Sequence, residues 1–356
     1  MTAAVPRSQR FASSSGRRVT LLAEVTTLGV GGPAGDFVPV TTESELVERV
    51  QGCDRAGEAL LVLGGGSNIV VADDGFGGTV LQIGTTGSSV DSVAGDRVQL
   101  TLAAGEPWDA AVERCVAEGW SGIEALAGIP GLVGATPLQN VGAYGQEIAQ
   151  VATSLRALDR TTGQVQIMSS RECRFRYRGS RLKDEPDRWV VLAVTFQLSN
   201  DALSEVRFTQ VADALGVAVG ARVPVREVRD VVLQLRATKG MVINQGDCDT
   251  RSVGSFFLNP IVDPAHAVPD CPQFPEGDQV KLSAAWLIEQ AGIHRGWRPD
   301  TNCAAAVSTK HTLAIVNLGG ATAADVLHVA AAIRNRVASV HGVWLEPEPR
   351  LVGCRL

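Results

Sequence analysis

The chain has 356 residues, 45% of them hydrophobic, and a formal net charge of -6. This length allows two or three domains, and the acidic balance argues against nucleic acid or an anionic membrane as a general partner, because both need a basic surface. The seven cysteines are dispersed and the five histidines lack ligand spacing, which favours a reducing cytoplasm and no metal site.

The N-terminal residues 1–19 contain Arg and Ser but no apolar signal-peptide core. We interpret them as a disordered start, and an organelle transit peptide of similar composition is the alternative. No apolar run is long enough to span a bilayer.

The first glycine-rich stretch, Gly29–Ala34, formally matches the dinucleotide fingerprint G-x-G-x-x-A. Its context contradicts such a site, because a short strand, Phe37–Val40, follows where the fingerprint needs a helix. A helix is predicted only later, where Thr42 and Glu45 have the spacing of a capping box. We therefore expect no Rossmann site here.

A second glycine-rich loop, residues 64–68, lies between the strand-like patterns 59–63 and 69–71. A loop between two strands is neither a P-loop nor a Rossmann turn, but its backbone N–H groups can still bind phosphate. Short strands are predicted over 78–102. A helix is then expected from Pro107, at its first position, to about Gly119.

The longest glycine-rich and proline-rich stretch runs from Gly128 to Gly145 and excludes an ordinary helix or central strand. A loop of this length inside a compact domain is usually functional. Its few polar side chains indicate binding by backbone N–H groups. One pyrophosphate held by this loop and residues 64–68 is the economical interpretation, and two unrelated turns are the alternative.

Residues 153–198 are predicted to form strands around a turn at Thr161–Gly163, and they include a basic segment, 171–183. In a strand, Arg174, Arg176 and Arg178 would share one face. This face is either a solvated edge that resists aggregation or a site for a carboxylate or diphosphate.

The C-terminal part of the sequence alternates helical and strand-like patterns. Helices are predicted over 225–236, 283–291 and 322–340, the last with a cap at Thr322 and Asp325; strands or strand-like segments are predicted at 252–260, 312–318 and 343–353. We find no internal repeat and no low-complexity linker.

Six motifs occur in an order that resembles the UDP-N-acetylenolpyruvoylglucosamine reductase (MurB) family. They are GGGSN at 64–68, GIPGLVGA at 128–135, QNVGAYG at 139–145, YRGS at 177–180, GSFFLNP at 254–260 and WLEPE at 344–348. The resemblance covers residues 25 to 354 and implies an α+β protein with an FAD-binding fold of the vanillyl-alcohol-oxidase type. The FAD-binding region would comprise two subdomains, 20–85 and 86–222, followed by an α+β substrate-binding domain, 223–324, and a helix and strand, 325–356, that complete the active site.

The resemblance also implies the activity. Members of the family use NADPH and FAD to reduce the enolpyruvyl ether of a UDP-sugar to UDP-N-acetylmuramate, a cytoplasmic peptidoglycan precursor. Because loop 64–68 contains neither His nor Cys, the FAD should be noncovalent. A monomer is expected. Arg178 and Glu348 match the groups that stabilise charge at the substrate carboxylate, and Ser255 matches the proton donor.

The remaining site residues follow from the same motifs. Expected FAD contacts are Gly64, Gly65, Gly66, Ser67, Asn68, Gly134, Ala135, Thr136, Gln139, Asn140, Gly142, Ala143, Tyr144 and Arg350, and expected substrate contacts are Tyr177, Lys239, Asn259, Arg295 and His311. No metal is implied.

One departure from the family concerns the segment 203–215, which resembles a flexible loop that closes over the UDP. Phe208 stands where that loop commonly carries a tyrosine, so stacking would have to replace a hydroxyl contact. Two other functions remain open: an FAD oxidase that uses oxygen, and a nucleotide-binding regulatory protein without catalysis, which would be colourless.

Overall fold

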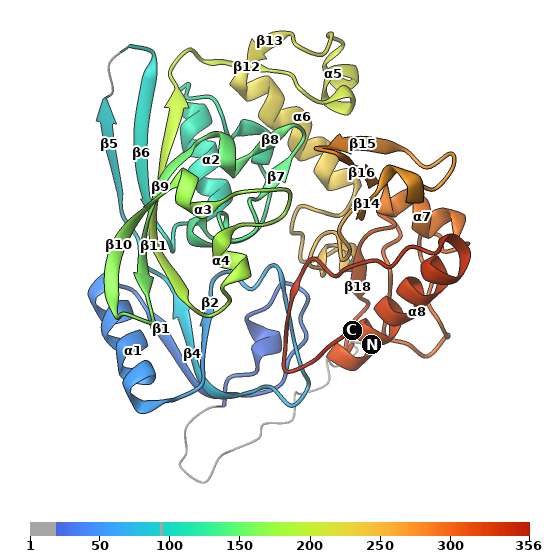
Figure 1. The fold of residues 1–356 in the computed structure, drawn as a ribbon, viewed down its shortest axis with the longest axis horizontal. Coiled ribbons are helices and arrows are strands. Elements are labelled where there is room, and N and C mark those ends of the chain that lie inside the picture. The colour runs from blue at the N-terminus through green and yellow to red at the C-terminus, as the bar shows by residue number, and fades with distance from the viewer. Residues whose placement is uncertain (1–18, 93–94) are drawn as a thin grey trace, which may run out of the picture.

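The computed structural model describes residues 19–92 and 95–356. Of the expected disordered start, 1–19, all but Val19 lies outside the described residues. Figure 1 shows three regions: a small sheet with α1 at the bottom, a larger sheet above it, and a C-terminal region on the right that carries α7 and α8.

The first region is a parallel sheet covered by one helix. The strands β1 (Ala34–Val40), β4 (Phe76–Ile83) and β2 (Leu60–Leu63) lie in the order β1-β4-β2. The helix α1 (Glu43–Ala56) begins after Thr42, whose side chain accepts a hydrogen bond from the N–H of Glu45, and it buries Leu46 and Val50 in the core with this sheet. The expectation that a strand, and not a Rossmann helix, follows the first glycine-rich stretch is confirmed.

The second region is built on an antiparallel sheet. Its strand order is β10 (Gln164–Ser169), β9 (Ala152–Asp159), β11 (Trp189–Ser199), β6 (Arg97–Ala103) and β5 (Ser88–Ser92). The helices α2 (Trp108–Ala117) and α6 (Val225–Thr238) share its apolar core. Trp108 and Phe196 meet in that core with ring centroids 6.0 Å apart. Pro107 occupies the N-cap position of α2, one residue before the helix begins at Trp108, and so is not its first residue as predicted.

The segment predicted as a flexible loop, 203–215, contains regular structure. It forms β12 (Leu203–Glu205), which pairs with β13 (Arg222–Pro224), and α5 (Thr209–Leu215), which packs against α6. These elements form the top of the molecule in Figure 1.

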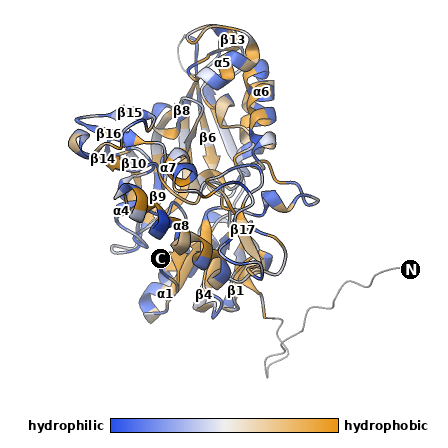
Figure 2. Cartoon of the chain, turned by 90° about the vertical axis from the view of Figure 1, so that its right-hand side faces the viewer, coloured by the Kyte–Doolittle hydropathy of each residue, from blue (hydrophilic) through white to orange (hydrophobic). Residues whose placement is uncertain are grey.

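The C-terminal region is built around two helices, α7 (Ala284–Gln290) and α8 (Ala323–His341), whose side chains share one apolar core. Its strands are β14 (Ile261–Val262), β15 (Gln273–Glu276), β16 (Gln279–Leu282), β17 (Ala305–Val307) and β18 (Ile315–Asn317). The predicted capping box of Thr322 and Asp325 is confirmed at the start of α8. Figure 2 shows hydrophobic and hydrophilic residues on both α6 and α8, as expected for helices with one buried face.

Contacts far apart in the sequence fix the C-terminal region to the first one. The strand β3 (Ile69–Val71) pairs in parallel with β19 (Arg350–Val352). The carboxylate of Asp73 accepts hydrogen bonds from the N–H groups of Ala323 and Ala324, at the positive end of the α8 dipole. Residues 347–350 are thereby brought beside the loop 64–68. Within the described part of the chain, no helix combines the length and apolarity that crossing a membrane requires.

The prediction of a basic strand at 171–183 is wrong. After β10 the chain forms a helical turn, α3 (Ser170–Cys173), and after a tight turn it forms α4 (Arg181–Asp184). The side chains of Ser169 and Ser180 cap these turns, and Arg174 and Arg178 have positive φ values of 46° and 47°, which interrupt an extended chain.

The arginines of this segment therefore share no common face. Arg174 pairs with Glu185 and Arg176 pairs with Asp184, and both arginines are exposed. Arg178 turns inward to Glu348. The solvated-edge interpretation thus describes two of the residues, and the anion-site interpretation can concern the third.

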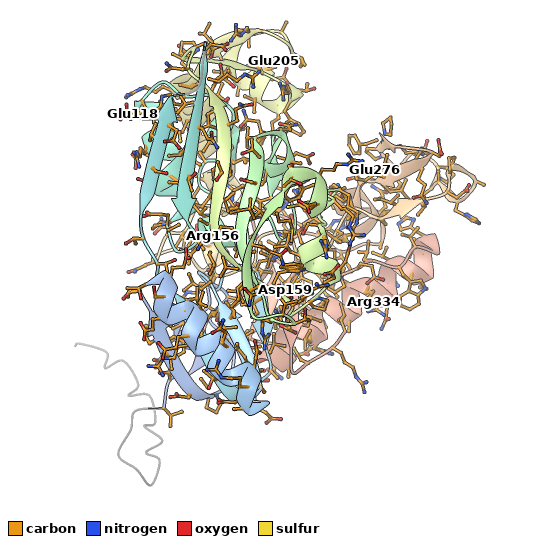
Figure 3. The ribbon with its side chains drawn as sticks, turned by 60° about the vertical axis from the view of Figure 1, so that its left-hand side comes forward. Glu118, Arg156, Asp159, Glu205, Glu276 and Arg334 are labelled. Carbon is orange, nitrogen blue, oxygen red and sulfur yellow. The ribbon has the colours of Figure 1, made fainter. Side chains whose placement is uncertain are left out.

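A buried carboxylate, Asp159, holds the end of β9. It is 1% exposed and accepts hydrogen bonds from Arg188 Nη2 at 2.8 Å and from the N–H of Thr161 at 2.9 Å. Figure 3 places it between the two sheets, far from the exposed Glu205. The hydrogen bond from Arg188 holds the pKa of Asp159 below its ordinary value.

We expect Asp159→Asn to lower the free energy of unfolding by about 2 kcal/mol at pH 7, because the buried carboxylate that accepts the charged hydrogen bonds of Arg188 is lost, while Arg188 keeps its ion pair with Glu185. Since the pKa of Asp159 is lower in the folded state, its contribution is complete above the unfolded pKa of about 4 and is lost as pH falls toward the folded value. Urea unfolding at pH 7 and at about pH 3, below the unfolded pKa, measures both effects. Glu205→Gln, which removes an exposed partner of Arg207, should change stability by less than about 1 kcal/mol. Equal losses in the two variants would contradict the assignment.

Candidate active site

A cavity of about 730 Å³ lies where the three regions meet. This volume is in the range of small-molecule and cofactor sites, roughly 300–1,000 Å³. Its walls come from loop 64–68, the Gly128–Gly145 loop, the segment after β10, the end of α6, and residues 347–350. Apolar side chains, among them Ile83, Trp108, Leu132, Trp189 and Val190, cover part of the wall.

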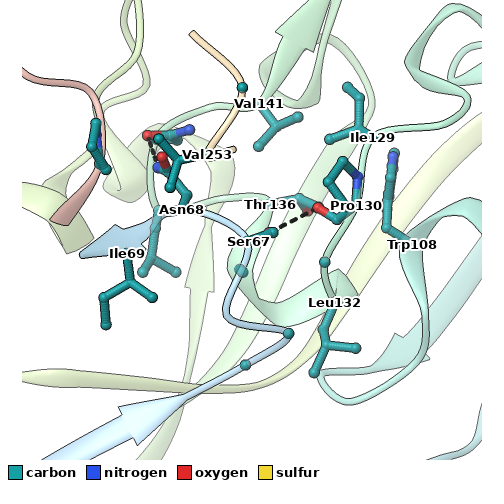
Figure 4. A pocket seen from close by; sticks show the side chains of 18 of the residues that line it. Ser67, Asn68, Ile69, Trp108, Ile129, Pro130, Leu132, Thr136, Val141 and Val253 are labelled. Atoms are coloured by element: carbon teal, nitrogen blue, oxygen red, sulfur yellow. Dashed lines mark hydrogen bonds between the residues drawn. The ribbon is translucent and has the colours of Figure 1, made fainter. Parts of the chain in front are cut away.

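The two glycine-rich loops line the same cavity and pack against each other. A Cβ on Gly65 would lie 3.0 Å from the Cα of Gly131, and Ser67 Oγ donates a hydrogen bond to the carbonyl oxygen of Pro130 at 3.0 Å (Figure 4). Gly131 has a φ of 121°, a conformation that other residues rarely adopt. The alternative of two unrelated turns is therefore wrong, and the loops present a continuous wall of main chain.

Gly134 has a different reason to be glycine. A Cβ there would lie 2.5 Å from the Cβ of Ala104, at the end of β6, and its N–H donates a hydrogen bond to the Ala104 carbonyl. Its missing side chain thus allows close packing on the second sheet, while its backbone lines the cavity.

A chain of polar side chains crosses the cavity. Asn68 Nδ2 donates to Gln139 Oε1 at 2.9 Å, and Gln139 Nε2 donates to Glu348 Oε1 at 3.1 Å. Arg178 Nε lies 3.4 Å from the same carboxyl oxygen, and Arg178 Nη2 donates to the carbonyl of Gly142 at 2.6 Å. The four residues come from four different sequence motifs and form one connected network of hydrogen bonds and an ion pair.

The carboxyl group of Glu348 is more shielded from solvent than its partner Arg178. Its side chain is 15% exposed, and this burial raises its pKa. The charges of Arg178 and Lys183 and the hydrogen bond from Gln139 act in the opposite direction. Glu348 is thus a carboxyl group paired with Arg178 and influenced by the charge of Lys183, able to accept or donate a hydrogen bond within the cavity.

Ser255 lines the cavity on a segment that the sequence predicted as strand-like. The segment forms isolated pairs instead, with Ser255 opposite Ala314 and Phe257 opposite Pro347. Phe256 and Phe257 are both buried, so the segment lacks the alternation of a half-buried strand. The N–H of Glu348 donates to the carbonyl of Phe256 at 2.8 Å, which places the Ser255 and Glu348 segments side by side.

Cationic and aromatic groups line another part of the cavity. Lys239, at the end of α6, donates to Gln210 Oε1 at 2.9 Å and lies 5.6 Å from the ring centroid of Tyr144. Phe208 packs edge-on against Tyr144 with centroids 5.6 Å apart, so it contributes a ring contact to this part of the wall. Burial lowers the pKa of His311 to about 4, which leaves this side chain neutral at pH 7.

Four predicted site residues lie outside the cavity lining. Asn140 is fully buried; its Nδ2 donates to the carbonyl of Arg176, and its Oδ1 accepts from the N–H of Ala149. Its contacts hold the Gly128–Gly145 loop in shape.

Tyr177, Asn259 and Arg295 are the other three. The Tyr177 hydroxyl accepts a hydrogen bond from the N–H of Asn259 at 3.4 Å, and Asn259 Oδ1 accepts one from Ala284 at the start of α7. Arg295 is exposed. Their roles toward a ligand stay predictions. Arg350, which does line the cavity, pairs with Asp187 at 2.6 Å.

Sequence reasoning missed Arg236, a buried cation in the cavity wall. It is 8% exposed and donates to the carbonyls of Gly128 and Met241, and burial lowers its pKa to about 10. Its signal was present, because it continues the buried helical stripe of Val225, Val228 and Val232, where a cation is unusual. Lys183, also in the wall, carried no such signal.

The donor set favours an organic, anionic ligand. Among the residues that the structure describes, no three His, Cys, Asp or Glu side chains are grouped so that they could hold a metal ion. Glycine backbone at close approach suits a pyrophosphate, and the aromatic and aliphatic wall suits a flat ring system.

Comparison with known proteins agrees with this arrangement. Residues 33–169 match the model of the FAD binding domain, and the chain is an FAD-binding oxidoreductase. Residues 246–352 match the UDP-N-acetylenolpyruvoylglucosamine reductase C-terminal domain. The chain belongs to the UDP-N-acetylenolpyruvoylglucosamine reductase family, and the predicted α+β, FAD-binding fold with a C-terminal domain is confirmed.

Individual relatives align along nearly the whole chain. The reductase of this name from Thermobifida fusca is 48% identical over 94% of the chain and 97% of its own length. That from Saccharopolyspora erythraea is 49% identical over 94% of the chain and 95% of its own length. The crystal structure of the Thermus caldophilus reductase superimposes with a TM-score of 0.64 at 27% identity, covering 94% of this chain and 99% of that one.

Replacing Gly65 tests whether the packed glycine loops form the FAD site. Gly65→Val should weaken FAD binding at least about tenfold, because the new side chain meets Gly131 and overpacking typically costs 1–3 kcal/mol. Equilibrium titration of the apoprotein with FAD measures the change. Gly77→Ala is the control, since a Cβ there meets nothing within 4 Å. Unchanged affinity in Gly65→Val would place the cofactor elsewhere.

Proposed function

We propose that the chain reduces UDP-N-acetylenolpyruvoylglucosamine to UDP-N-acetylmuramate, with NADPH as hydride donor and FAD held noncovalently, as a monomer in the cytoplasm during peptidoglycan precursor synthesis. The observation that carries the proposal is the meeting of Arg178, Glu348 and the Ser255 segment at one cavity. The name of the relatives supports the substrate.

The cavity residues suit this chemistry. FAD, when bound, supplies transfer of a hydride from NADPH to the enol carbon. As negative charge moves toward the substrate carboxylate, the guanidinium of Arg178 would stabilise it, and a protonated Glu348 would donate a hydrogen bond. Burial, which raises the pKa of Glu348, favours that protonated form.

Ser255 is the proposed proton donor to the neighbouring carbon. A serine hydroxyl is a weak acid, so its position must supply the advantage. The pairing of its segment with Leu313 on one side and with Glu348 on the other fixes that position.

The remaining groups suit binding. Lys239 is an available cation for the diphosphate, because its hydrogen-bond partner in the structure is the neutral amide of Gln210. A neutral His311 can donate or accept a hydrogen bond beside it. Loop 64–68 has no His or Cys for covalent attachment of a flavin.

The visible spectrum of the purified protein tests the proposal. We expect a yellow protein whose flavin band bleaches with NADPH and returns when the UDP-sugar is added, with one NADPH consumed per product and no peroxide formed. Acid precipitation should release the flavin into the supernatant. Peroxide production in air at the rate of turnover would support the oxidase, and a colourless protein would support the regulatory alternative.

Ser255→Ala separates the two halves of the reaction. Bleaching by NADPH should remain fast, while the return of colour with the UDP-sugar should slow by about 10² to 10⁴, the usual contribution of a placed general acid. Ser255→Cys, which retains a transferable proton, should recover part of this loss. Stopped-flow absorbance measures each half. A variant that is slow in the NADPH half, or normal in both, would remove Ser255 from this role.

A further inference from the structure

Lys183 is an exposed residue in the cavity wall next to the proposed catalytic groups, and hydrogen bonds at its main chain and its ammonium group fix where it lies. It belongs to α4, which begins after Ser180. The Ser180 hydroxyl accepts a hydrogen bond from the N–H of Lys183 and donates one to the carbonyl of Leu138 at 2.6 Å. The short helix is thereby attached to the Gly128–Gly145 loop. From it, Lys183 Nζ donates to the carbonyl oxygen of Arg178 at 3.1 Å.

Arg178 needs such support at its main chain. Its φ of 47° is in the left-handed region, which non-glycine residues adopt infrequently. Its guanidinium is held by the Gly142 carbonyl and by Glu348. Lys183 binds the carbonyl oxygen of Arg178, so both the main chain and the side chain of Arg178 are held in place.

We propose that Lys183 is a positioning residue for the pair of Arg178 and Glu348: it holds the main chain of Arg178 through its carbonyl oxygen and places a second positive charge beside the carboxyl group of Glu348. The catalytic consequence rests on the proposed function. The positioning itself is a property of the protein without substrate.

Few groups influence the Glu348 carboxyl, so the loss of one can be measured. From the segment after β10 it faces Arg178, Lys183 and the hydroxyl of Tyr177; from the Gly128–Gly145 loop it accepts the hydrogen bond of Gln139. Arg178 and Lys183 are the two cations that favour its ionised form. Removing Lys183 therefore leaves one cation, and the pKa of Glu348 should rise.

Lys183→Met is the test variant, because methionine keeps much of the apolar stem and removes the donor and the charge. Lys183→Arg restores the charge. Arg174→Met is the matched control, since Arg174 lies on the same segment, is 62% exposed and pairs with Glu185 away from the cavity.

The first measurement is the titration of Glu348 in the FAD-loaded protein without substrate. Infrared difference spectra of each variant against the same variant carrying Glu348→Gln isolate this carboxyl. We expect its pKa to rise by about one unit in Lys183→Met, which corresponds to the loss of one nearby charge, and to stay within a few tenths in Arg174→Met. Lys183→Arg should lie close to the parent protein.

The second measurement is turnover of the UDP-sugar with NADPH. In Lys183→Met, kcat should fall about tenfold, the effect of misplacing a charged group by a fraction of an ångström. FAD affinity and the NADPH half-reaction should remain unchanged. The alkaline limb of the kcat profile should move to higher pH together with the Glu348 titration, because the protonated acid persists to higher pH.

The outcomes separate this inference from the proposed function. If Lys183→Met shifts the Glu348 titration and no variant reduces the UDP-sugar, the positioning role is supported and the substrate assignment fails. If the UDP-sugar is reduced but Lys183→Met resembles Arg174→Met in both titration and turnover, the positioning role is overturned. Failure of Lys183→Arg to restore the titration would also overturn it.

Discussion

The ion pair between Arg178 and Glu348 is the contact on which the site depends, because its two members come from different regions of the fold. Arg178 lies between β10 and β11 of the second sheet, whereas Glu348 lies two residues before β19. A partly buried charge is stable only when its partner is in place, so the pair requires both regions to dock correctly. The pairing of β19 with β3 and the contact of Asp73 with the start of α8 fix the C-terminal region to the first region, whose loop 64–68 packs in turn against the Gly128–Gly145 loop.

The cavity wall formed by the two glycine-rich loops consists mainly of main chain. Loop 64–68 and the Gly128–Gly145 loop pack so closely that a Cβ on Gly65 would meet the main chain of Gly131. Side chains can therefore act mainly at the margins of the wall, where Ser67 binds Pro130 and Asn68 reaches Gln139. One edge of this wall is thus also the start of the polar chain to Glu348.

Local features of the fold were predictable from the sequence, and features set by distant contacts were not. The helices α1 and α8 followed from their capping residues, and α6 followed from its apolar stripe. The segment 171–183 looked extended because alternating arginines suit a strand, but serine caps and positive φ angles fold it into helical turns. No pattern within one segment could show that Glu348 pairs with it.

The site residues divide in the same way. Ser255, Glu348 and Arg178, which the motifs singled out, line one cavity. Asn140, from an equally specific motif, lies outside the cavity lining and supports the Gly128–Gly145 loop through its hydrogen bonds. A sequence motif therefore does not distinguish a residue that lines the cavity from one that holds the conformation of a loop.

The pairing of β3 with β19 also bears on when the protein can acquire its cofactor. Cys354 Sγ donates to the carbonyl of Val70 across 284 residues of sequence. Domains fold largely from the N-terminus as they emerge from the ribosome, and distant strand pairs close late. Loop 64–68 emerges early but lacks its neighbouring strand until β19 has been synthesised. Flavin capture is therefore expected to be among the last events of biogenesis, and a nascent chain halted within α8 would carry both glycine loops without a finished cavity.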